Sequence, residues 1–520
     1  MSLSRLDIAI LVVYAVSIFT LAQWVSREQG ARKKNAQDYF LAGRSLPWWA
    51  IGTSLIAANI SAEQIIGMSG SGYVIGLAIA SYEWMAAATL ILVGKYFLPI
   101  FLKNGIYTMP EFLEKRYSHS VRTVMAVFWL GVYVFVNLTA ILWLGATAVH
   151  AVTGIEVQTA LIALGVFAGA YALYGGLKAV ALTDIVQVSL LVLGGFVITY
   201  VALGKISAGA GVIAAFHELT LRFPDKFHMI LPKSNPNYKD LPGLSVLLGG
   251  MWVMNVSYWG FNQYIIQRGL AAKSVREAQK GILLAAFLKL LMPVIIVLPG
   301  IAAAALEPNL ARADEAYGRL MALLPSGLLG LVFAALVAAI VASMGSKINS
   351  IATIFTIDVY LPLRPRSSQP HLVRVGRITA ATALLIAIVM ARPLLGSFDQ
   401  AFQYIQEFTG FFTPGICVIF LLGLFWARCT VGGALAAAIA SAVLSLALKL
   451  FWPALPFMDR VGIVFVACLG IAVVLSLLQA RPKPLLKMDL THIDYSTTAG
   501  FNAGAAAVVA ILIGLYATWW

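Results

Sequence analysis

Residues 61–85 read SAEQIIGMSGSGYVIGLAIASYEWM, and they combine apolar side chains that suit a lipid bilayer with polar ones that do not. The polar residues are Glu63, Gln64 and Glu83, and glycines stand at positions 67, 70, 72 and 76. Each glycine weakens a helix by roughly 1 kcal/mol relative to alanine. The stretch therefore predicts a helix that is interrupted at membrane depth, where freed backbone groups must be satisfied by protein or by a water-filled cavity. A kinked helix that packs closely through its small residues is the alternative.

The composition around this stretch is that of a membrane protein. Of the 520 residues, 61% are hydrophobic and 11% are charged, whereas a soluble globular protein is about half apolar and about a quarter charged. The net charge of +14 is spread over short loops between apolar runs, which excludes the single basic block of a nucleic-acid-binding surface. The three cysteines have neither a disulfide framework nor metal-ligand spacing. We therefore expect a multi-pass protein of the plasma membrane, which is the inner membrane in a bacterium.

Apolar runs long enough to cross a bilayer, about 20 residues each, recur along the whole chain. They lie near residues 8–25, 48–66, 76–101, 122–150, 156–174, 181–204, 244–267, 280–305, 326–357, 374–391, 401–425, 431–453, 461–479 and 500–519. The sequence thus predicts an all-α polytopic membrane protein with fourteen transmembrane helices.

Lysine and arginine are distributed unevenly between alternate loops, and this asymmetry sets the orientation. Most of those outside the helices fall in 26–47, 102–122, 175–180, 268–280, 358–377, 426–430 and 480–499. These loops are therefore expected in the cytoplasm, and both termini are expected outside.

The long polar loop 205–243 separates two halves of five helices each. Because five is odd, the second half enters the membrane from the opposite side, which is the pattern of an inverted repeat. The second half begins with an interrupted stretch of its own, LLGGMWVMNVSYWGFNQYIIQ at 247–267. The expected divisions are a first helix and cytoplasmic loop (1–47), a first repeat (48–204), an extracellular loop (205–243), a second repeat (244–425) and three C-terminal helices (426–520).

Glu83 and Lys289 lie deep in apolar runs, where a charged side chain costs roughly 2.5–3.5 kcal/mol on insertion scales. A structural ion pair between helices 76–101 and 280–305 would explain both. A polar cavity that hydrogen-bonds a hydroxyl-rich ligand is the functional interpretation, and the two are compatible. We favour the cavity.

Amide side chains extend this polar set, and they stand on interrupted helices at Gln64, Asn255, Gln403 and Gln406. Several amides with one acid and one base suit a neutral polyol, because an anion would require spare positive charge and a cation more acid. Tyr258 and Trp259 are placed to stack on a sugar ring, with helix packing as the alternative. Met68, Tyr82 and Phe402 are expected on the outer side, as an apolar lid or as core packing.

Asp184 follows Thr183 at the expected start of helix 181–204. We favour capping of that helix N-terminus over a role in ion exit. Glu63 adjoins the interrupted stretch and is expected to stabilise its half-helix. The chain has no GxSxG, HExxH or Walker motif and no histidine–cysteine cluster, so we predict neither an enzyme nor a bound cofactor.

Four stretches resemble the sodium:solute symporter family, most closely its sodium/galactose and sodium/glucose members. They are DYFLAGRSLPWWAIGTSLIAANISAEQIIGMSGSGY at 38–73, YGGLKAVALTDIVQV at 174–188, YWGFNQYIIQRGLAAKS at 258–274 and FQYIQEFTG at 402–410. The resemblance runs nearly end to end. It implies a LeuT-type core of five plus five helices in inverted repeat, with additional flanking helices.

The resemblance also implies the residues of a sugar site. The sugar would be hydrogen-bonded by Gln64, Glu83, Asn255, Lys289 and Gln406, with Asn59 lining the same site. Tyr258 would stack beneath the sugar as the inner gate, and Met68, Tyr82 and Phe402 would form the outer gate. Ala86 stands where galactose-type relatives have serine, which leaves the identity of the hexose open.

The coupling ion implied by the resemblance is sodium. It would be held by the backbone carbonyls of Ala57, Ile60 and Ala339 and by two adjacent serine hydroxyls, of which this chain keeps only Ser343. Lys347 follows one helical turn later, where relatives carry an apolar residue. Its amine is expected either to reach the inner interface or to substitute for sodium. Substitution would make transport sodium-independent or proton-linked, and we favour sodium.

Together these features predict a secondary active transporter that couples sodium to a neutral hexose by alternating access, with Asp184 on a possible sodium exit path. The expected partners are a monosaccharide, sodium and the bilayer, with no nucleic acid, and the oligomeric state stays open. A symporter for proline, pantothenate or sialic acid is the nearest alternative. A membrane sugar sensor and an integral membrane enzyme are alternatives from other classes, and the enzyme lacks a catalytic constellation.

Overall fold

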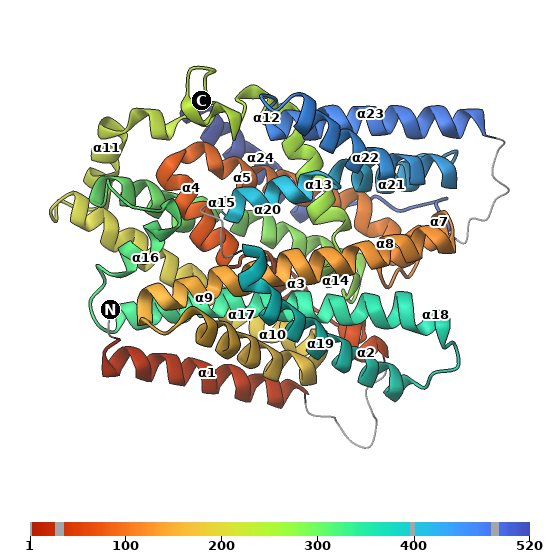
Figure 1. Cartoon of the computed structure of the whole chain (residues 1–520), viewed down its shortest axis with the longest axis horizontal. Helices are drawn as coiled ribbons and strands as arrows, with labels where there is room; N and C mark the ends of the chain where they lie inside the picture. The colour runs from red at the N-terminus through yellow and green to blue at the C-terminus, as the bar shows by residue number, and fades with distance from the viewer. Residues whose placement is uncertain (1–2, 27–35, 396–400, 480–487) are drawn as a thin grey trace.

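The computed structural model describes residues 3–26, 36–395, 401–479 and 488–520. Within these ranges every regular element is a helix, and one isolated β-bridge joins Leu46 to Ala272. The helices form one elongated bundle (Figure 1). An all-α protein is what the apolar runs predicted.

The bundle contains long membrane-length helices and short helical pieces between them. The α-helices are α1 (Arg5–Ser26), α2 (Ala36–Leu41), α3 (Trp48–Asn59), α4 (Ser69–Val74), α5 (Ser81–Leu92), α6 (Leu98–Lys103), α7 (Met109–Arg116), α8 (His119–Val132), α9 (Thr139–Thr153), α10 (Val157–Ile206), α11 (Val212–Arg222), α12 (Leu244–Leu248), α13 (Gly250–Phe261), α14 (Gln263–Leu270), α15 (Val275–Leu306), α16 (Ala316–Met321), α17 (Leu328–Ile354), α18 (Leu361–Leu363), α19 (Gln369–Leu395), α20 (Ala401–Gly410), α21 (Thr413–Phe425), α22 (Val431–Phe451), α23 (Phe457–Leu478) and α24 (Ala499–Thr518). Short 3₁₀ turns span Ala42–Arg44, Leu77–Ala80, Pro224–Phe227, Pro236–Lys239 and Ala313–Glu315. Wider π-helical turns span Glu63–Met68, Val93–Phe97, Tyr133–Leu138 and Phe355–Tyr360.

Ten helical segments in the described part of the chain are long and apolar enough to cross a membrane. They are Arg5–Val25, Leu77–Lys103, His119–Thr153, Leu177–Ile206, Val275–Leu306, Leu328–Leu363, Gln369–Leu395, Val431–Phe451, Phe457–Leu478 and Ala499–Thr518. Val157–Ala170 and Thr413–Phe425 are shorter apolar helices. The protein is therefore a multi-pass membrane protein, while the count of fourteen crossings stays a prediction.

The loop predicted at 175–180 is not present, because α10 continues without a break through both expected helices, 156–174 and 181–204. A straight helix of 50 residues would be about 75 Å long, more than twice the hydrocarbon thickness of about 30 Å. The two apolar segments inside α10 remain distinct, at Val157–Ala170 and Leu177–Ile206.

The first interrupted helix breaks earlier than its glycines suggested. The helix α3 ends at Asn59, Ile60 takes an extended conformation with φ −78° and ψ 115°, and a π-helical turn resumes at Glu63. Gly70 and Gly72 lie in α4 and bring backbones close together, whereas Gly76, at φ +93°, stands between α4 and the 3₁₀ turn Leu77–Ala80. A Cβ on Gly72 would stand 2.7 Å from the Val297 carbonyl oxygen of α15. Gly70 and Gly72 therefore serve close packing, which was the alternative interpretation. The first break lies at residues 60–61, and a second interruption lies at Gly76.

The second interrupted helix is divided twice. Gly249 separates α12 from α13, and Asn262, with φ −83° and ψ 121°, separates α13 from α14. The interruption predicted within 247–267 is thus confirmed. It places Asn255 and Tyr258 on α13 and Tyr264 on α14.

Both chain ends lie toward one end of the bundle, near α11 and α16, whereas α7 and α18 lie toward the other end (Figure 1). We call these the termini end and the α7 end. An even number of crossings requires the two termini on the same side. Which side faces the cytoplasm stays a prediction from the basic residues.

The segment 205–243, expected as a loop, contains α11 and two 3₁₀ turns. It is fixed to α4 by Lys226, whose amine donates hydrogen bonds to the carbonyl oxygens of Tyr73 (2.6 Å) and Val74 (3.0 Å). Gly76, at φ +93°, lets the chain pass so close that a Cβ would meet the Lys226 carbonyl oxygen at 2.3 Å. Burial lowers the pKa of the Lys226 amine below its ordinary value.

The last helix holds the same segment from the other side. The Met229 amide donates a hydrogen bond of 2.6 Å to the carbonyl oxygen of Trp519, just after α24. The Trp519 ring packs against Phe227 with centroids 5.4 Å apart. The C-terminal end of the chain and the segment 205–243 are therefore packed together at the termini end.

Candidate functional site

A cavity of about 130 Å³ lies where the two interrupted helices face each other. Its walls come from the break after α3, from α5, α8, α13, α14, α15, α20 and α21, and from the π-helical turns at 63–68 and 133–138. The polar lining residues are Asn59, Glu63, Gln64, Glu83, Asn137, Asn255, Ser257, Asn262, Lys289, Gln406, Thr409 and Thr413. All six residues predicted to bind substrate are among them.

Glu83 on α5 and Lys289 on α15 form an ion pair in the cavity wall. Both side chains are almost completely buried, with 4% and 1% of their area exposed. The Lys289 ammonium also donates to the side-chain oxygen of Asn59 and lies 5.0 Å from the centre of the Trp259 ring. The predicted pairing of these two helices is therefore present, and it contains a third member, Asn59.

Asn59 connects this pair to the other interrupted helix. While its oxygen accepts from Lys289, its Nδ2 donates a hydrogen bond of 3.0 Å to the Tyr258 hydroxyl. The amide thus uses both of its polar atoms to hold the acid–base pair and the tyrosine in a fixed relation. It can do so because it is the last residue of α3, where the helix ends and the side chain turns into the cavity.

The amides predicted as sugar ligands make few contacts with protein. Gln64 accepts a hydrogen bond of 3.1 Å from the Ser61 hydroxyl, and the Asn255 Nδ2 donates to the Met251 carbonyl on its own helix at 3.1 Å. Gln406 lines the cavity from α20. Gln64 and Asn255 therefore keep polar atoms that face the cavity. The Gln403 side chain lies outside the described residues.

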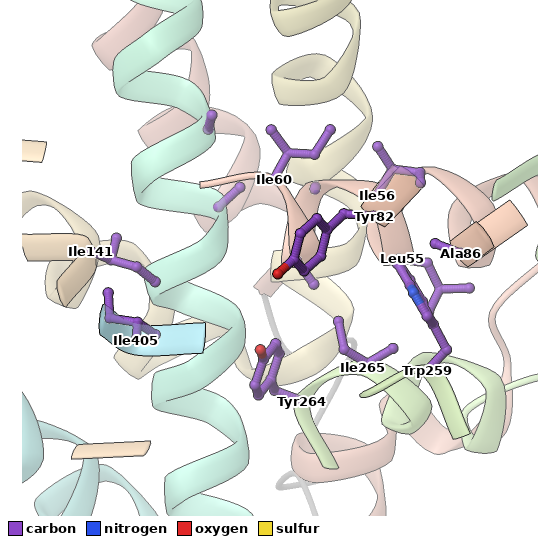
Figure 2. Packing of buried hydrophobic residues seen from close by; sticks show 14 of the residues in the cluster. Leu55, Ile56, Ile60, Tyr82, Ala86, Ile141, Trp259, Tyr264, Ile265 and Ile405 are labelled. Atoms are coloured by element: carbon purple, nitrogen blue, oxygen red, sulfur yellow. The ribbon is translucent and has the colours of Figure 1, made fainter. Parts of the chain in front are cut away.

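Aromatic side chains close the cavity on several sides. Tyr258 packs edge-on against Trp259 and Tyr264, with ring centroids 5.2 and 5.8 Å apart. Figure 2 shows the rings of Tyr82, Trp259 and Tyr264, each carried by a different element. Met68 and Tyr82 line the cavity, whereas the Phe402 side chain lies outside the described residues. Sequence reasoning missed Tyr264. The available signal was its position in the same interrupted stretch as Tyr258, six residues later.

Sequence reasoning also missed the part of the cavity wall that residues 133–138 form, because residues 122–150 were interpreted as one uninterrupted helix. A π-helical turn at Tyr133–Leu138 directs Tyr133 and Asn137 toward the cavity. The Tyr133 hydroxyl donates to the Asn262 side-chain oxygen at 2.5 Å and accepts from the Gln263 amide at 3.0 Å. It thereby satisfies the backbone at the break between α13 and α14. An asparagine within an apolar helix was the available signal.

The residues expected to bind sodium lie together at the end of α3 and on α17. Ala57, Ile60, Ala339 and Ser343 are all buried, and the Ser343 hydroxyl donates a hydrogen bond of 3.2 Å to the Ala58 carbonyl oxygen. The last carbonyls of a helix have no partner within it, so this region attracts positive charge. The Ser343 contact joins the two elements, as the expected site requires.

Lys347 does not extend to the membrane interface, so that interpretation is wrong. Its side chain is buried, and its amine donates a hydrogen bond of 2.9 Å to the Ser343 hydroxyl. The amine also lies 4.3 Å from the centre of the Tyr264 ring. Ser343 lies one turn earlier on the same helix, α17, whereas Tyr264 comes from α14. A helical periodicity cannot reveal the partner that another helix supplies.

Asp184 is not a helix cap, because α10 passes through it without interruption. Its carboxylate is fully buried and accepts a hydrogen bond of 2.5 Å from the Ser54 hydroxyl of α3. The Arg268 guanidinium of α14 lies 4.0 Å away and also binds Ser54 and Ser346. Asp184 therefore belongs to a buried network that joins α3, α10, α14 and α17.

Comparison with known proteins places this architecture. The sodium:solute symporter family matches residues 39–441. The chain is 50% identical to a sodium/glucose cotransporter of Vibrio parahaemolyticus, covering 100% of this chain and 99% of the relative. It is 31% identical to the mouse sodium/myo-inositol cotransporter 2, covering 86% of this chain and 70% of the relative.

Among solved structures, a Na⁺-coupled sialic acid symporter superimposes with a TM-score of 0.81 at 23% identity, covering 92% of this chain and 99% of that one. A likeness at this identity shows the fold, which is of the LeuT type that the sequence resemblance implied. The matched family consists of transporters, which decides against an enzyme. The chain therefore belongs to the sodium:solute symporter family.

Proposed function

We propose that this protein carries a neutral hexose across the membrane, driven by the sodium gradient. The observation that carries the proposal is the cavity between the two interrupted helices, where one closed acid–base pair, Glu83 and Lys289, stands among amides that face inward. Hydroxyl groups both donate and accept hydrogen bonds, as amides do. A neutral polyol therefore matches the cavity better than a charged solute does.

The balance of charge argues against an anionic substrate. The Lys289 ammonium is already engaged by Glu83 and Asn59, so it offers little free positive charge to a carboxylate. A sialic acid would bring such a carboxylate. The names of the sodium/glucose and sodium/myo-inositol relatives support a neutral polyol instead. The missing hydroxyl at Ala86 leaves glucose, galactose and myo-inositol to be compared directly.

Transport would proceed by alternating access. Sodium at the end of α3 would stabilise the state open to the outside, and sugar binding would close Met68, Tyr82 and Phe402 over the cavity. Tyr258, bound to Asn59, would then release the sugar inward. The membrane potential contributes about 2.3 kcal/mol per charge per 100 mV. With the basic loops in the cytoplasm, both termini lie on the external face of the inner membrane.

The decisive experiment is uptake of labelled glucose, galactose and myo-inositol into proteoliposomes. We expect an inward sodium gradient to accelerate uptake of at least one of them relative to a potassium or choline gradient. Accumulation above the external concentration would also exclude a sensor that binds without turnover. Uptake of none of the three above that of protein-free liposomes would contradict the proposal.

Substitution of Gln64 by alanine should weaken sugar binding without unfolding the protein. Among the described residues its side chain accepts one hydrogen bond, from nearby Ser61, so the fold should tolerate its loss. Because Gln64 lines the cavity, we expect at least about a tenfold rise in the half-saturating sugar concentration, the equivalent of about 1.4 kcal/mol. The matched control is Gln279→Ala, since Gln279 is a buried amide on α15 that does not line the cavity. Equal sugar affinities for the wild type and the Gln64 variant would remove Gln64 from the site.

A further inference from the structure

The oxygen atoms at the end of α3 and on α17 form a place for a cation. The C-terminal end of a helix carries partial negative charge and favours cations, and α3 ends inside the protein at Asn59. The Ser343 hydroxyl adds an oxygen from α17 and contacts the Ala58 carbonyl. The second hydroxyl expected beside it is missing, because the neighbour is Ala342.

The chain supplies a cation of its own at this place. The Lys347 ammonium binds the same Ser343 oxygen at 2.9 Å and lies against the face of Tyr264. With 1% of its surface exposed, Lys347 has no route to solvent for its charge in this conformation. A charge this deeply buried persists only when other groups compensate it.

The compensating groups are in the same region. Glu63, at the start of the π-helical turn after α3, is within electrostatic reach of Lys347. One of its carboxylate oxygens, Oε1, has no hydrogen-bond partner among the described residues. Arg268 is a second positive charge near Lys347, and its own partners are Asp184, Ser54 and Ser346. The region thus contains the Lys347 ammonium, the Glu63 carboxylate within electrostatic reach of it, and the neighbouring network of Arg268 and Asp184.

We propose that the Lys347 ammonium acts as a built-in cation that competes with sodium for the oxygen cluster formed by Ser343 and the end of α3. The inference rests on the proposed function only in taking sodium as the coupling ion. Like charges repel, so sodium cannot occupy the cluster at full strength while the ammonium binds Ser343. Lys347 therefore determines how strongly the transporter depends on sodium. The competition requires no change in the protonation of Lys347.

The test removes the ammonium while it keeps the length of the side chain. We expect Lys347→Met to lower the half-saturating concentration in a radioactive sodium binding assay by at least about tenfold, or about 1.4 kcal/mol. The matched control is Lys95→Met, since Lys95 is a half-buried lysine on the π-helical turn Val93–Phe97, with its amine 5.3 Å from the centre of the Tyr96 ring. Identical sodium binding by the wild type and Lys347→Met would overturn the inference.

A second variant protects the test if Lys347→Met fails to fold. Ala342→Ser restores a hydroxyl while leaving the ammonium in place, so we expect less than about a threefold change in sodium affinity. A tenfold gain from Ala342→Ser alone would show that the number of oxygen ligands limits binding, which would contradict the role of Lys347.

Sodium binding is measured without sugar, and this separates the inference from the proposed function. Tighter sodium binding by Lys347→Met with no sugar uptake by either protein would support the inference and reject the hexose. Sugar uptake by both proteins, with the same sodium affinity in each, would support the proposed hexose transport and reject the role of Lys347. A wild type that binds sodium weakly and a Lys347→Met variant that binds it more than tenfold more tightly would be the strongest form of the expected result.

Discussion

Lys289→Met should abolish sugar uptake and destabilise the protein by about 3–5 kcal/mol. The substitution leaves Glu83 charged, 4% exposed and without its partner in the interior. It also frees the Asn59 oxygen, so that the link from Asn59 to Tyr258 loses its anchor. Uptake of labelled sugar into proteoliposomes and the thermal unfolding midpoint of the purified protein measure the two effects.

A double variant separates the two causes. In Glu83→Gln/Lys289→Met both charges are gone, and replacing a whole buried pair is often nearly neutral for stability. We therefore expect the double variant to recover most of the lost stability while uptake stays absent. Wild-type uptake by Lys289→Met would exclude Lys289 from the sugar site, and an unchanged melting temperature would show that Glu83 does not need its partner.

Gly300→Ala should be similarly damaging, although alanine is normally the better helix residue. A Cβ on Gly300 would stand 2.0 Å from the Ser69 carbonyl oxygen and 3.0 Å from the Tyr73 amide nitrogen. Both atoms belong to the backbone of α4, so α4 and α15 would have to separate. Overpacking of this kind costs about 1–3 kcal/mol and occasionally more, and we expect about 3 kcal/mol here.

The function should suffer as well, because α4 directly follows the π-helical turn that carries Gln64. The matched control is Gly470→Ala, an alanine placed inside α23 with nothing within 4 Å of the new Cβ. That variant should be as stable as the wild type or more stable by up to about 1 kcal/mol. Equal melting temperatures for the two variants would show that the contact between α4 and α15 can relax at little cost.

Much of the site could be predicted because membrane burial makes polar residues informative. Glu83, Lys289 and Asn255 stand in apolar runs where each needs a reason to be present, and all three line one cavity. The interruption near Asn262 also followed from the sequence. A polar side chain in a membrane segment is energetically costly, so it is usually retained only where it has a partner or a function.

The remainder depended on contacts between helices, which a one-dimensional pattern does not contain. Lys347 was compatible with an interface position because Tyr264, the ring against which its amine lies, belongs to another helix, α14. Asp184 was interpreted as a cap because its hydroxyl donor, Ser54, is 130 residues away in the chain. The break after α3 was assigned to glycines, whose weak intrinsic preference yields to tertiary packing.

The hydrogen bond from Met229 to Trp519 has a consequence for how the protein is made. A ribosome that adds roughly 5–20 residues per second reaches Trp519 on the order of 15–60 seconds after Met229, which precedes it by about 290 positions. During that interval the middle segment can dock on α4 through Lys226 but has no C-terminal strap. The segment 205–243 can therefore bind α4 early in synthesis, whereas its contact with the C-terminal residues forms last. The order of translation sets this sequence of events.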